Sequence, residues 1–480
     1  MQESRLSTRT RLKMIGSLAS LCLTSSHRKT ASAEPVDTPP NIVVIVTDDM
    51  RDSDLGVLER TSELVAASGT TFPNFFLTTP QCSPSRASIL TGLYAHNHGV
   101  RQNGFPLGGW DVFNENGLED RTIAVALSDA GYHTVFAGKY LNGFPEDGSV
   151  PAGWDEFYAT GEVVYTDFTL NENGVPFNYS ASSGVYSTDI LLDKLLQPID
   201  RTPVDTPLFL VFAPSAPHAP ARPAARHEKA FRDAVVDMPP AFNEVDITDK
   251  PDYIRESPPV DDEMVNSLNR LQRKRLASLL AVDEAVSSIW DALAKQDRLA
   301  NSYIFVLSDN GYLMGEHRAM AKQMPYDAAV RVQMWAYGPG FGTGKVDDRL
   351  VANIDIAPTL AAIAGIESFP SDGISLLGES SRDGILIECQ ASPFDMEEIS
   401  ANESKGWPPT YQAIRTDRYL YVEYETGERE LYDYEDDPYE LDNLLADWEG
   451  HAPTTDPEGM ANQLRARLDE LRDCAFETCP

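Results

Sequence analysis

Residues 41–49 read Asn41-Ile-Val-Val-Ile-Val-Thr-Asp-Asp49. The uninterrupted run of mostly β-branched residues over 41–47 predicts a strand that is buried on both faces, as in a parallel sheet. Asp48 and Asp49 follow at the carboxyl end of this strand, where open α/β sheets bind their ligands. The stretch therefore predicts a parallel sheet with a polar site at one of its edges.

The same pattern of a buried-type strand followed by polar residues occurs three more times. Because the carboxyl ends of parallel strands meet at one edge of a sheet, we expect all four sets of polar side chains to lie close together. Helix-like segments between the strands predict a layered α/β fold with a central, mostly parallel sheet. The three further runs are 133–137 before Lys139, 208–213 before His218, and 303–307 before Asp309 and Asn310; the helix-like segments are 122–130, 187–196, 262–296 and 354–364.

A cysteine opens the segment Cys82-Ser-Pro-Ser-Arg86, which continues into an apolar, helix-like run that ends at Gly92. Pro84 excludes a strand interior and suits the first turn of a helix. Cys82 should therefore lie where free backbone N–H groups and the helix dipole favour an anion. Arg86, one turn further on, adds a cation whose planar donor fork suits a tetrahedral oxyanion.

The acidic residues of the predicted sheet edge offer oxygen ligands, which suit Ca²⁺ or Mg²⁺ better than zinc or copper. Such a cation would offset the repulsion between clustered carboxylates and an anionic substrate, and it could polarise a substrate oxygen. The oxygen donors are Asp48, Asp49, Asp309 and Asn310, and the cationic wall that would complete the site consists of Arg86, Lys139, His218 and Lys322.

Composition sets limits on the partners of the chain. The formal net charge is −35, from 74 acidic and 39 basic residues, which argues against nucleic acid as a partner. An anionic substrate would be attracted only by a local basic site, because the overall field opposes it. No apolar stretch is long enough to form a transmembrane segment.

The first 33 residues have the features of an export signal. Basic residues precede a short apolar run over 14–23, and Ala31-Ser-Ala33 fits a small-residue cleavage site, so we expect a secreted or otherwise exported protein. Cys474 and Cys479 could close a small disulfide loop, which would suit an oxidising compartment. Their spacing does not fit a zinc site.

The composition changes near residue 368, and a smaller α+β unit is expected from there to the C-terminus. Two strand-like segments, 419–424 and 429–434, flank Thr426-Gly427 and predict a hairpin, and 461–472 has the pattern of an amphipathic helix. The predicted organisation is a signal peptide over 1–33, a catalytic domain over 34–367 and a C-terminal subdomain over 368–480.

Cys82-x-Pro-x-Arg86 followed by Thr91-Gly92 resembles the signature of the type I sulfatases, whose cysteine is oxidised by a separate formylglycine-generating enzyme. The other polar motifs fall in the order found in that family. Several segments look most like N-acetylglucosamine-6-sulfatases: Gly138-Lys-Tyr-Leu-Asn142, 168–174, 351–358 and 474–479.

The resemblance implies an alkaline-phosphatase-like fold and hydrolysis of a sulfated carbohydrate or an aryl sulfate. One Ca²⁺ would be bound by Asp48, Asp49, Asp309, Asn310 and the formylglycine made from Cys82. Arg86 and Lys139 would steady the aldehyde diol, and Lys139, His218 and Lys322 would hold the sulfate. One diol oxygen would attack sulfur and release the alcohol; the second hydroxyl would then expel sulfate and regenerate the aldehyde.

The chain departs from many sulfatases at Leu141, where those enzymes have a histidine that helps to deprotonate the diol. His317 is a possible substitute or substrate contact, or simply an exposed loop histidine. Two other functions compete with sulfate ester hydrolysis: a phosphodiester or phosphonate monoester hydrolase using the same site geometry, and a non-catalytic binder of sulfated glycans. The sulfated alcohol stays open among glucosamine 6-sulfate, galactosamine 6-sulfate and simple aryl sulfates.

Overall fold

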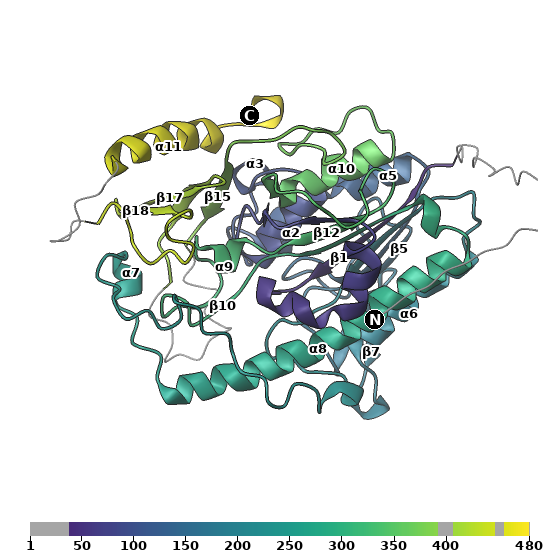
Figure 1. Ribbon diagram of the computed structural model, residues 1–480. Helices are drawn as coiled ribbons and strands as arrows, with labels where there is room; N and C mark the ends of the chain where they lie inside the picture. Colours follow the sequence, from purple (N-terminus) through teal and green to yellow (C-terminus); the bar gives the residue numbers. More distant parts are fainter. Residues whose placement is uncertain (1–37, 392–406, 447–455, 480) are drawn as a thin grey trace, which may run out of the picture. The chain divides into compact units, whose positions relative to one another are not determined.

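A ten-stranded sheet is the central element of the structure, a computed structural model that describes residues 38–391, 407–446 and 456–479 (Figure 1). The expected signal peptide over 1–33 lies outside these residues. From one edge of the sheet to the other, the strands are β13 (Lys345–Val346), β2 (Thr70–Phe72), β12 (Met334–Tyr337), β9 (Ser302–Ser308), β1 (Asn41–Thr47), β8 (Leu208–Ala213), β4 (His133–Lys139), β5 (Glu156–Thr160), β6 (Phe168–Glu172) and β7 (Val175–Tyr179).

The four strands expected from the sequence lie side by side as β9, β1, β8 and β4, and they pair in parallel. All residues of β1 are buried, and Val44 lies opposite Phe305 of β9 and Val211 of β8. Continuous burial on both faces explains why β1 is apolar throughout instead of alternating. The prediction of a mostly parallel core is confirmed, and the carboxyl ends of these strands meet at one edge.

Two groups of helices cover the sheet from opposite sides (Figure 1). In one group α6 (Ser187–Arg201) packs against α8 (Asp262–Lys295) and against β4 and β8. In the other, α2 (Cys82–Thr91), α5 (Ile123–Asp129) and α10 (Ile356–Ile363) pack together, and α5 contacts β4. The helices expected over 122–130, 187–196 and 354–364 therefore correspond to α5, α6 and α10. The shorter helices are α1 (Glu59–Thr61), α3 (Ala95–His98), α4 (Gly109–Glu115), α7 (Asp252–Arg255) and α9 (Asp327–Val330).

Two helices, α6 and α10, have ends that differ from the expected ones. Helix α6 continues to Arg201 through Pro198, beyond the expected end at 196. Helix α10 starts at Ile356 after a short 3-10 turn, two residues later than expected. At the start of α8, the side chain of Asp261 accepts a hydrogen bond from the Met264 N–H at 2.8 Å, a capping contact that fixes the first turn.

The C-terminal part forms a second, four-stranded antiparallel sheet with α11 (Pro457–Arg472) packed on it. A hairpin at one edge of this sheet joins β17 (Tyr419–Tyr424) and β18 (Arg429–Asp433), as predicted, and Cys474 and Cys479 form the disulfide that their spacing allowed. The remaining strands are β15 (Ile385–Cys389) and β16 (Tyr411–Arg415). The domain boundary at 367/368 falls between α10 and β15 and stays a prediction.

Residues 219–259 contain a single turn of 3-10 helix and the short helix α7, which agrees with the little regular structure expected there. Two pairs of short strands form separate two-stranded sheets: β10 (Leu313–Met314) with β11 (Met320–Ala321), and β14 (Val351–Ala352) with β3 (Phe75–Phe76). Within the described ranges, no helix has the length and apolar character required to cross a bilayer.

Candidate active site

Cys82 is the first residue of α2 and is completely buried. The preceding residue, Gln81, has an extended backbone, and its carbonyl accepts the first helical hydrogen bond from the Ser85 N–H at 3.1 Å. The helix ends at Gly92, whose φ of 71° is the left-handed conformation that glycine adopts at little cost. The predicted helix start is confirmed, and it fixes the direction in which the residue 82 side chain points.

Two carboxylates follow β1 and reach the start of α2. The Cys82 thiol contacts Asp48, with Sγ 3.5 Å from Oδ1. Asp49 has a φ of 66°, an unusual value for a residue with a side chain, and its N–H donates to Asp309 Oδ1 at 3.0 Å. Asp309 follows β9, so the carboxyl ends of two neighbouring strands are joined directly at the site.

Three cations surround these carboxylates within the buried site. Lys139, the last residue of β4, places Nζ 2.8 Å from Asp48 Oδ2. Arg86 directs Nε to Asp309 Oδ2 at 2.9 Å. Its second terminal nitrogen lies 3.5 Å from Asp48.

Lys322 lies between the second aspartate and the cysteine. Its Nζ is 2.8 Å from Asp49 Oδ1 and 2.9 Å from Cys82 Sγ. Together with Arg86 and Lys139, Lys322 places three positive side chains near residue 82. These are three of the four residues of the cationic wall that the sequence predicted.

His218 completes the group on the loop after β8. Its Nε2 lies 3.4 Å from Asp49 Oδ2, and its Nδ1 donates to the carbonyl of Ala219 at 2.6 Å. The hydroxyl of Tyr165 donates to the backbone carbonyl of His218 at 2.6 Å and holds the loop in place. The Nδ1 contact orients the ring so that Nε2 is directed toward the carboxylates.

Burial and neighbouring charges move the pKa values in opposite directions. Burial alone would raise the pKa of Asp48, but the charges of Lys139, His218 and Arg86 hold it well below its usual range. For Cys82, burial raises the pKa of the thiol, and the nearby lysines oppose this only in part. The pKa of Asp309 is raised by burial and by the charge of Asp48, despite the Arg86 guanidinium.

One ligand atom each from Asp48, Asp49, Cys82 and His218 lies within 4.8 Å of the others, a spacing that can hold a metal ion. Asn310 offers a further oxygen ligand for a metal ion, because its buried Oδ1 has no hydrogen-bond partner in the described part of the chain. Carboxylate and amide oxygens are ligands of a hard divalent cation. The residues present therefore fit such an ion.

The structure adds to what was expected of two predicted residues. His218 lies in the cluster whose spacing can hold a metal ion, and its expected contact with sulfate stays a prediction. Asp309 is a neighbour of the cluster, and its two oxygens already accept hydrogen bonds from the Asp49 N–H and from Arg86. The assignment of Asp309 as a metal ligand stays a prediction.

A cavity of about 460 Å³ opens beside the cluster and is lined by His218 and Lys322. Aromatic side chains and amides form much of its wall, a combination suited to a polar ring with an apolar face. The other wall residues with side-chain functions are Asn103, Phe105, Trp110, Asp111, Asn142, Glu162, Gln323 and Trp407. We infer that substrate enters here, because this cavity reaches the residues around Cys82.

The sequence did not point to several residues that position the site. Arg275 of α8 is fully buried and donates to the backbone carbonyl of Asp49 at 2.6 Å and to Asp54 at 2.7 Å. Asn103 accepts a hydrogen bond from the Ser83 N–H at the start of α2, at 2.9 Å. Asn142 also positions the start of α2, and it was noticed in the sequence only as part of the motif around Lys139. Its side-chain oxygen accepts a hydrogen bond from the Ser83 hydroxyl, and its N–H donates to the same hydroxyl.

Leu141 and His317 both lie in buried surroundings. Leu141 stands where many sulfatases have a histidine, and His317 was the suggested substitute for that histidine. Leu141 is part of the main hydrophobic cluster. His317 is buried, not exposed, and its Nδ1 lies 2.6 Å from Glu244 while its Nε2 lies 3.6 Å from Glu440. Because both ring nitrogens of His317 face carboxylates, its geometry favours a structural role over contact with substrate.

The His317 pair predicts a pH dependence of stability. Burial would lower the pKa of His317, but Glu244 and Glu440 raise it from 6.5 to about 9. Because the folded pKa is the higher one, the stabilisation is complete below pH 6.5 and is lost as pH rises through 9. The loss should be about 3 kcal/mol in the free energy of unfolding. Urea unfolding at pH 6 and pH 9.5 should show this difference for the wild type, and a similar loss in His317→Gln would contradict it.

Comparison with known proteins agrees with this site. The sulfatase family model matches residues 40–366, and the model for the C-terminal part of N-sulphoglucosamine sulphohydrolase matches residues 315–473. Human N-acetylglucosamine-6-sulfatase is 33% identical over 92% of this chain and 86% of its own length.

Solved structures show the same fold at lower identity. One solved structure shows a protein in complex with its substrate D-glucosamine-2-N,6-O-disulfate. It superposes on this chain with a TM-score of 0.75 at 22% identity, and the match covers 90% of this chain and 98% of that one. Phosphonate monoester hydrolase of Agrobacterium radiobacter gives a TM-score of 0.67 at 20% identity, over 90% of this chain and 95% of that one. With the family model matched over most of the length, the chain belongs to the sulfatase family of sulfuric ester hydrolases.

Proposed function

We propose that this protein removes the 6-sulfate from N-acetylglucosamine or a closely related glucosamine sulfate. The proposal is supported by the name of the human relative, which spans most of the chain, and by the sugar sulfate named for the solved structure of the same fold. The cavity beside Cys82 has polar and aromatic walls of the kind that bind sugar rings.

The observation that carries the proposal is the position of Cys82, buried at the head of α2 between Asp48 and Lys322. We propose that a separate formylglycine-generating enzyme oxidises this cysteine, and that the hydrated aldehyde is the nucleophile. One of its oxygens would attack sulfur and form the covalent enzyme sulfate while the sugar alcohol leaves. The second hydroxyl would then lose its proton and expel sulfate as the aldehyde forms again.

The neighbouring cations would bind the charged groups of this reaction. Arg86 and Lys139 reach Asp48, so they lie beside residue 82 and would hold its oxygens. Lys139 and Lys322 would also neutralise the sulfate oxygens, where negative charge accumulates during attack. His218, held through Nδ1, would supply a proton from Nε2 to the leaving sugar oxygen.

We further propose Ca²⁺, or Mg²⁺ in its place, as the ion held by Asp48, Asp49, Asn310 and the oxidised residue 82, with Asp309 beside them. Such an ion supplies Lewis-acid polarisation and offsets the carboxylate charges. Export is also proposed, because the signal-like pattern over 1–33 and the disulfide between Cys474 and Cys479 both suit an oxidising compartment.

A substrate panel tests this function. N-acetylglucosamine 6-sulfate should be hydrolysed with a higher kcat/KM than galactosamine 6-sulfate, an aryl sulfate or an aryl phosphodiester, and chelation should stop the reaction until Ca²⁺ is restored. Faster turnover of the phosphodiester, or of a phosphonate monoester, would instead assign the chain to the other hydrolase class. If protein with Cys82 converted to formylglycine binds the sulfated sugar but does not hydrolyse it, the chain would be a glycan-binding protein.

Modification of Cys82 can be checked directly on the peptide. Trypsin should release Thr61 to Arg86 with the sulfur of Cys82 replaced by oxygen and two hydrogens lost. Mass spectrometry of protein from a host with the maturing enzyme should show this change, and protein from a host without it should carry the intact thiol and little activity. An active preparation with an unmodified thiol would refute the proposed nucleophile.

A further inference from the structure

Lys322 is carried by an unusual stretch of backbone. The residues on either side of it, Ala321 and Gln323, have φ values of 70° and 77°, in the left-handed region that residues with a side chain rarely adopt. Such backbone costs free energy and persists only where the surrounding structure fixes it. The same backbone places Nζ of Lys322 at 2.9 Å from Cys82 Sγ and at 2.8 Å from Asp49 Oδ1. Whatever fixes residues 321–323 therefore also decides where the ammonium group lies.

Two hydrogen bonds to distant parts of the chain fix the backbone of Gln323. Its N–H donates to the carbonyl of Pro80, two residues before Cys82, at 3.1 Å. Its carbonyl accepts from the hydroxyl of Tyr411, the first residue of β16, at 3.0 Å. Gln323 and Tyr411 are both buried, so bulk solvent would not replace a lost partner.

The C-terminal sheet also binds the residues that follow Gln323. The Tyr326 hydroxyl donates to Glu430 of β18 at 3.0 Å. Asp327 accepts from the guanidinium of Arg415, on β16, at 3.0 Å. The segment that begins at Lys322 is therefore attached to this sheet at residues 323, 326 and 327.

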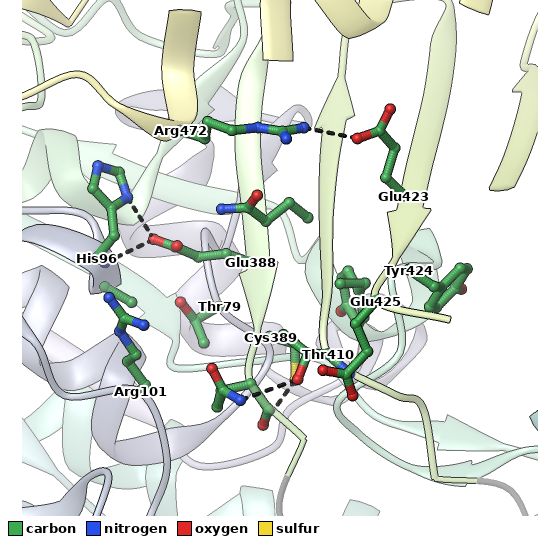
Figure 2. Close-up of a pocket in the computed structure, with 14 residues that line it drawn as sticks. Thr79, His96, Arg101, Glu388, Cys389, Thr410, Glu423, Tyr424, Glu425 and Arg472 are labelled. Atoms are coloured by element: carbon green, nitrogen blue, oxygen red, sulfur yellow. Dashed lines mark hydrogen bonds and ion pairs between the residues drawn. The ribbon is translucent and has the colours of Figure 1, made fainter. Parts of the chain in front are cut away.

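The same sheet contacts the segment that leads into Cys82. The Glu388 N–H of β15 donates to the carbonyl of Thr78 at 2.9 Å. The next residue, Thr79, and Glu388 line one cavity of about 430 Å³ beside the sheet (Figure 2). One sheet is thus hydrogen-bonded to both of the segments that bring Lys322 and Cys82 together.

Tyr411 is suited to hold a backbone carbonyl. Burial raises the pKa of its hydroxyl well above the ordinary value of 10, so the group stays protonated at neutral pH and can donate. Its ring packs against Tyr424, with ring centroids 5.7 Å apart, and this contact within the sheet fixes its orientation. The sheet therefore presents a neutral, oriented donor to the strained residue.

We propose that Tyr411 is a positioning residue for sulfate ester hydrolysis and acts through Lys322. Its hydroxyl keeps Gln323 in the left-handed conformation, and this keeps the neighbouring ammonium group at residue 82 and at the sulfate that reacts there. The inference rests on the role proposed above for Lys322. It gives the C-terminal sheet a part in the reaction, although none of the residues proposed above for catalysis or metal binding comes from that sheet.

Deletion of the hydroxyl tests this role. Tyr411→Phe keeps the ring, and it should lower kcat/KM about tenfold for both nitrophenyl sulfate and N-acetylglucosamine 6-sulfate, because both carry the sulfate that Lys322 is to bind. Tyr421→Phe removes the same atom from a buried tyrosine of β17, whose hydroxyl donates to Glu423 at 2.8 Å, and it should stay within twofold of wild type. An equal loss in Tyr421→Phe, or none in Tyr411→Phe, would overturn the proposal.

Combination with Lys322→Met separates positioning from damage to the fold. If Tyr411 acts through Lys322, the double variant should have the kcat/KM of Lys322→Met alone, within twofold, because the two effects are not additive. A further tenfold loss in the double variant would show that the hydroxyl serves the fold or another residue, and would contradict the proposal.

Gln323→Gly supplies a second background, in which Tyr411→Phe is less exposed to misfolding. Glycine adopts a φ of 77° at little cost, so the strain that the hydroxyl opposes is removed. Tyr411→Phe should then change kcat/KM by less than twofold relative to Gln323→Gly alone. A full tenfold loss in this background would mean that the hydroxyl has a different task.

Calorimetry with inorganic sulfate needs no turnover, and it distinguishes failure of this inference from failure of the proposed function. Sulfate should bind to wild type and Tyr421→Phe alike and about tenfold more weakly to Tyr411→Phe. If this holds while the converted wild type hydrolyses neither ester, the positioning role stands and the proposed function fails. If wild type hydrolyses both esters but Tyr411→Phe changes neither the kinetics nor the affinity for sulfate, the function stands and the positioning role fails.

Discussion

Cys82→Ala should lower kcat/KM for a 6-sulfated glucosamine by on the order of 10⁵-fold, the scale seen when an enzyme loses its nucleophile. The loss is this large because the alanine side chain cannot become the aldehyde diol, whereas the cations around it remain. Sulfate release by fully folded protein is the measurement. Because the change removes a single buried atom, the melting temperature should fall by only a few degrees.

A matched variant on the same helix isolates the chemical effect. Ser88 is also completely buried in α2, and its hydroxyl contacts the His98 ring at 3.1 Å, away from residue 82. Ser88→Ala deletes one polar atom of similar size and should change stability by about 1 kcal/mol while turnover stays near the wild-type value. Retention of most activity in Cys82→Ala would exclude the covalent mechanism.

Asp309→Ala should reduce turnover by about 10³-fold or more and lower the free energy of unfolding by about 3–5 kcal/mol. Asp309 holds Arg86 at 2.9 Å and also accepts the Asp49 N–H, so its removal leaves a buried guanidinium without its main partner and releases the strained backbone at Asp49. Activity, bound Ca²⁺ by elemental analysis and urea unfolding should all be measured on the same preparation.

A second buried ion pair serves as the control for stability alone. Asp355 pairs with Arg382 beside α10, and both side chains are almost completely buried. Asp355→Ala should destabilise to a similar extent, yet the folded fraction should keep its turnover and its metal content. Normal activity and normal Ca²⁺ content in Asp309→Ala would show that this carboxylate serves neither the metal nor Arg86.

The sequence predicted the sheet core and the meeting of its polar residues because both follow from local patterns. Runs such as 41–47 identify buried parallel strands, and the parallel arrangement alone brings Asp48, Lys139 and Asp309 to one edge. The start of α2 at Cys82 was equally local, since Pro84 and Gly92 mark its two ends.

Long-range contacts could not be predicted in this way. Arg275 looks like an ordinary residue of an amphipathic helix, yet it is fully buried on the backbone of Asp49, more than two hundred positions earlier. His317 looked like a loop histidine, and only the fold brings Glu244 and Glu440 to its two nitrogens. The cavity of about 430 Å³ that Arg101 lines together with residues of strands β15 to β17 has no signature in the sequence either.

The complete enclosure of Cys82 has a consequence for the order of events in biosynthesis. Every residue of α2 is buried, so the proposed maturing enzyme would have no access to the thiol once this helix has packed against its neighbouring helices. The conversion proposed above would therefore have to take place on the nascent or still extended chain. Protein that completes folding in a cell without that enzyme is locked in the thiol form, and later mixing with the enzyme should restore activity only after unfolding.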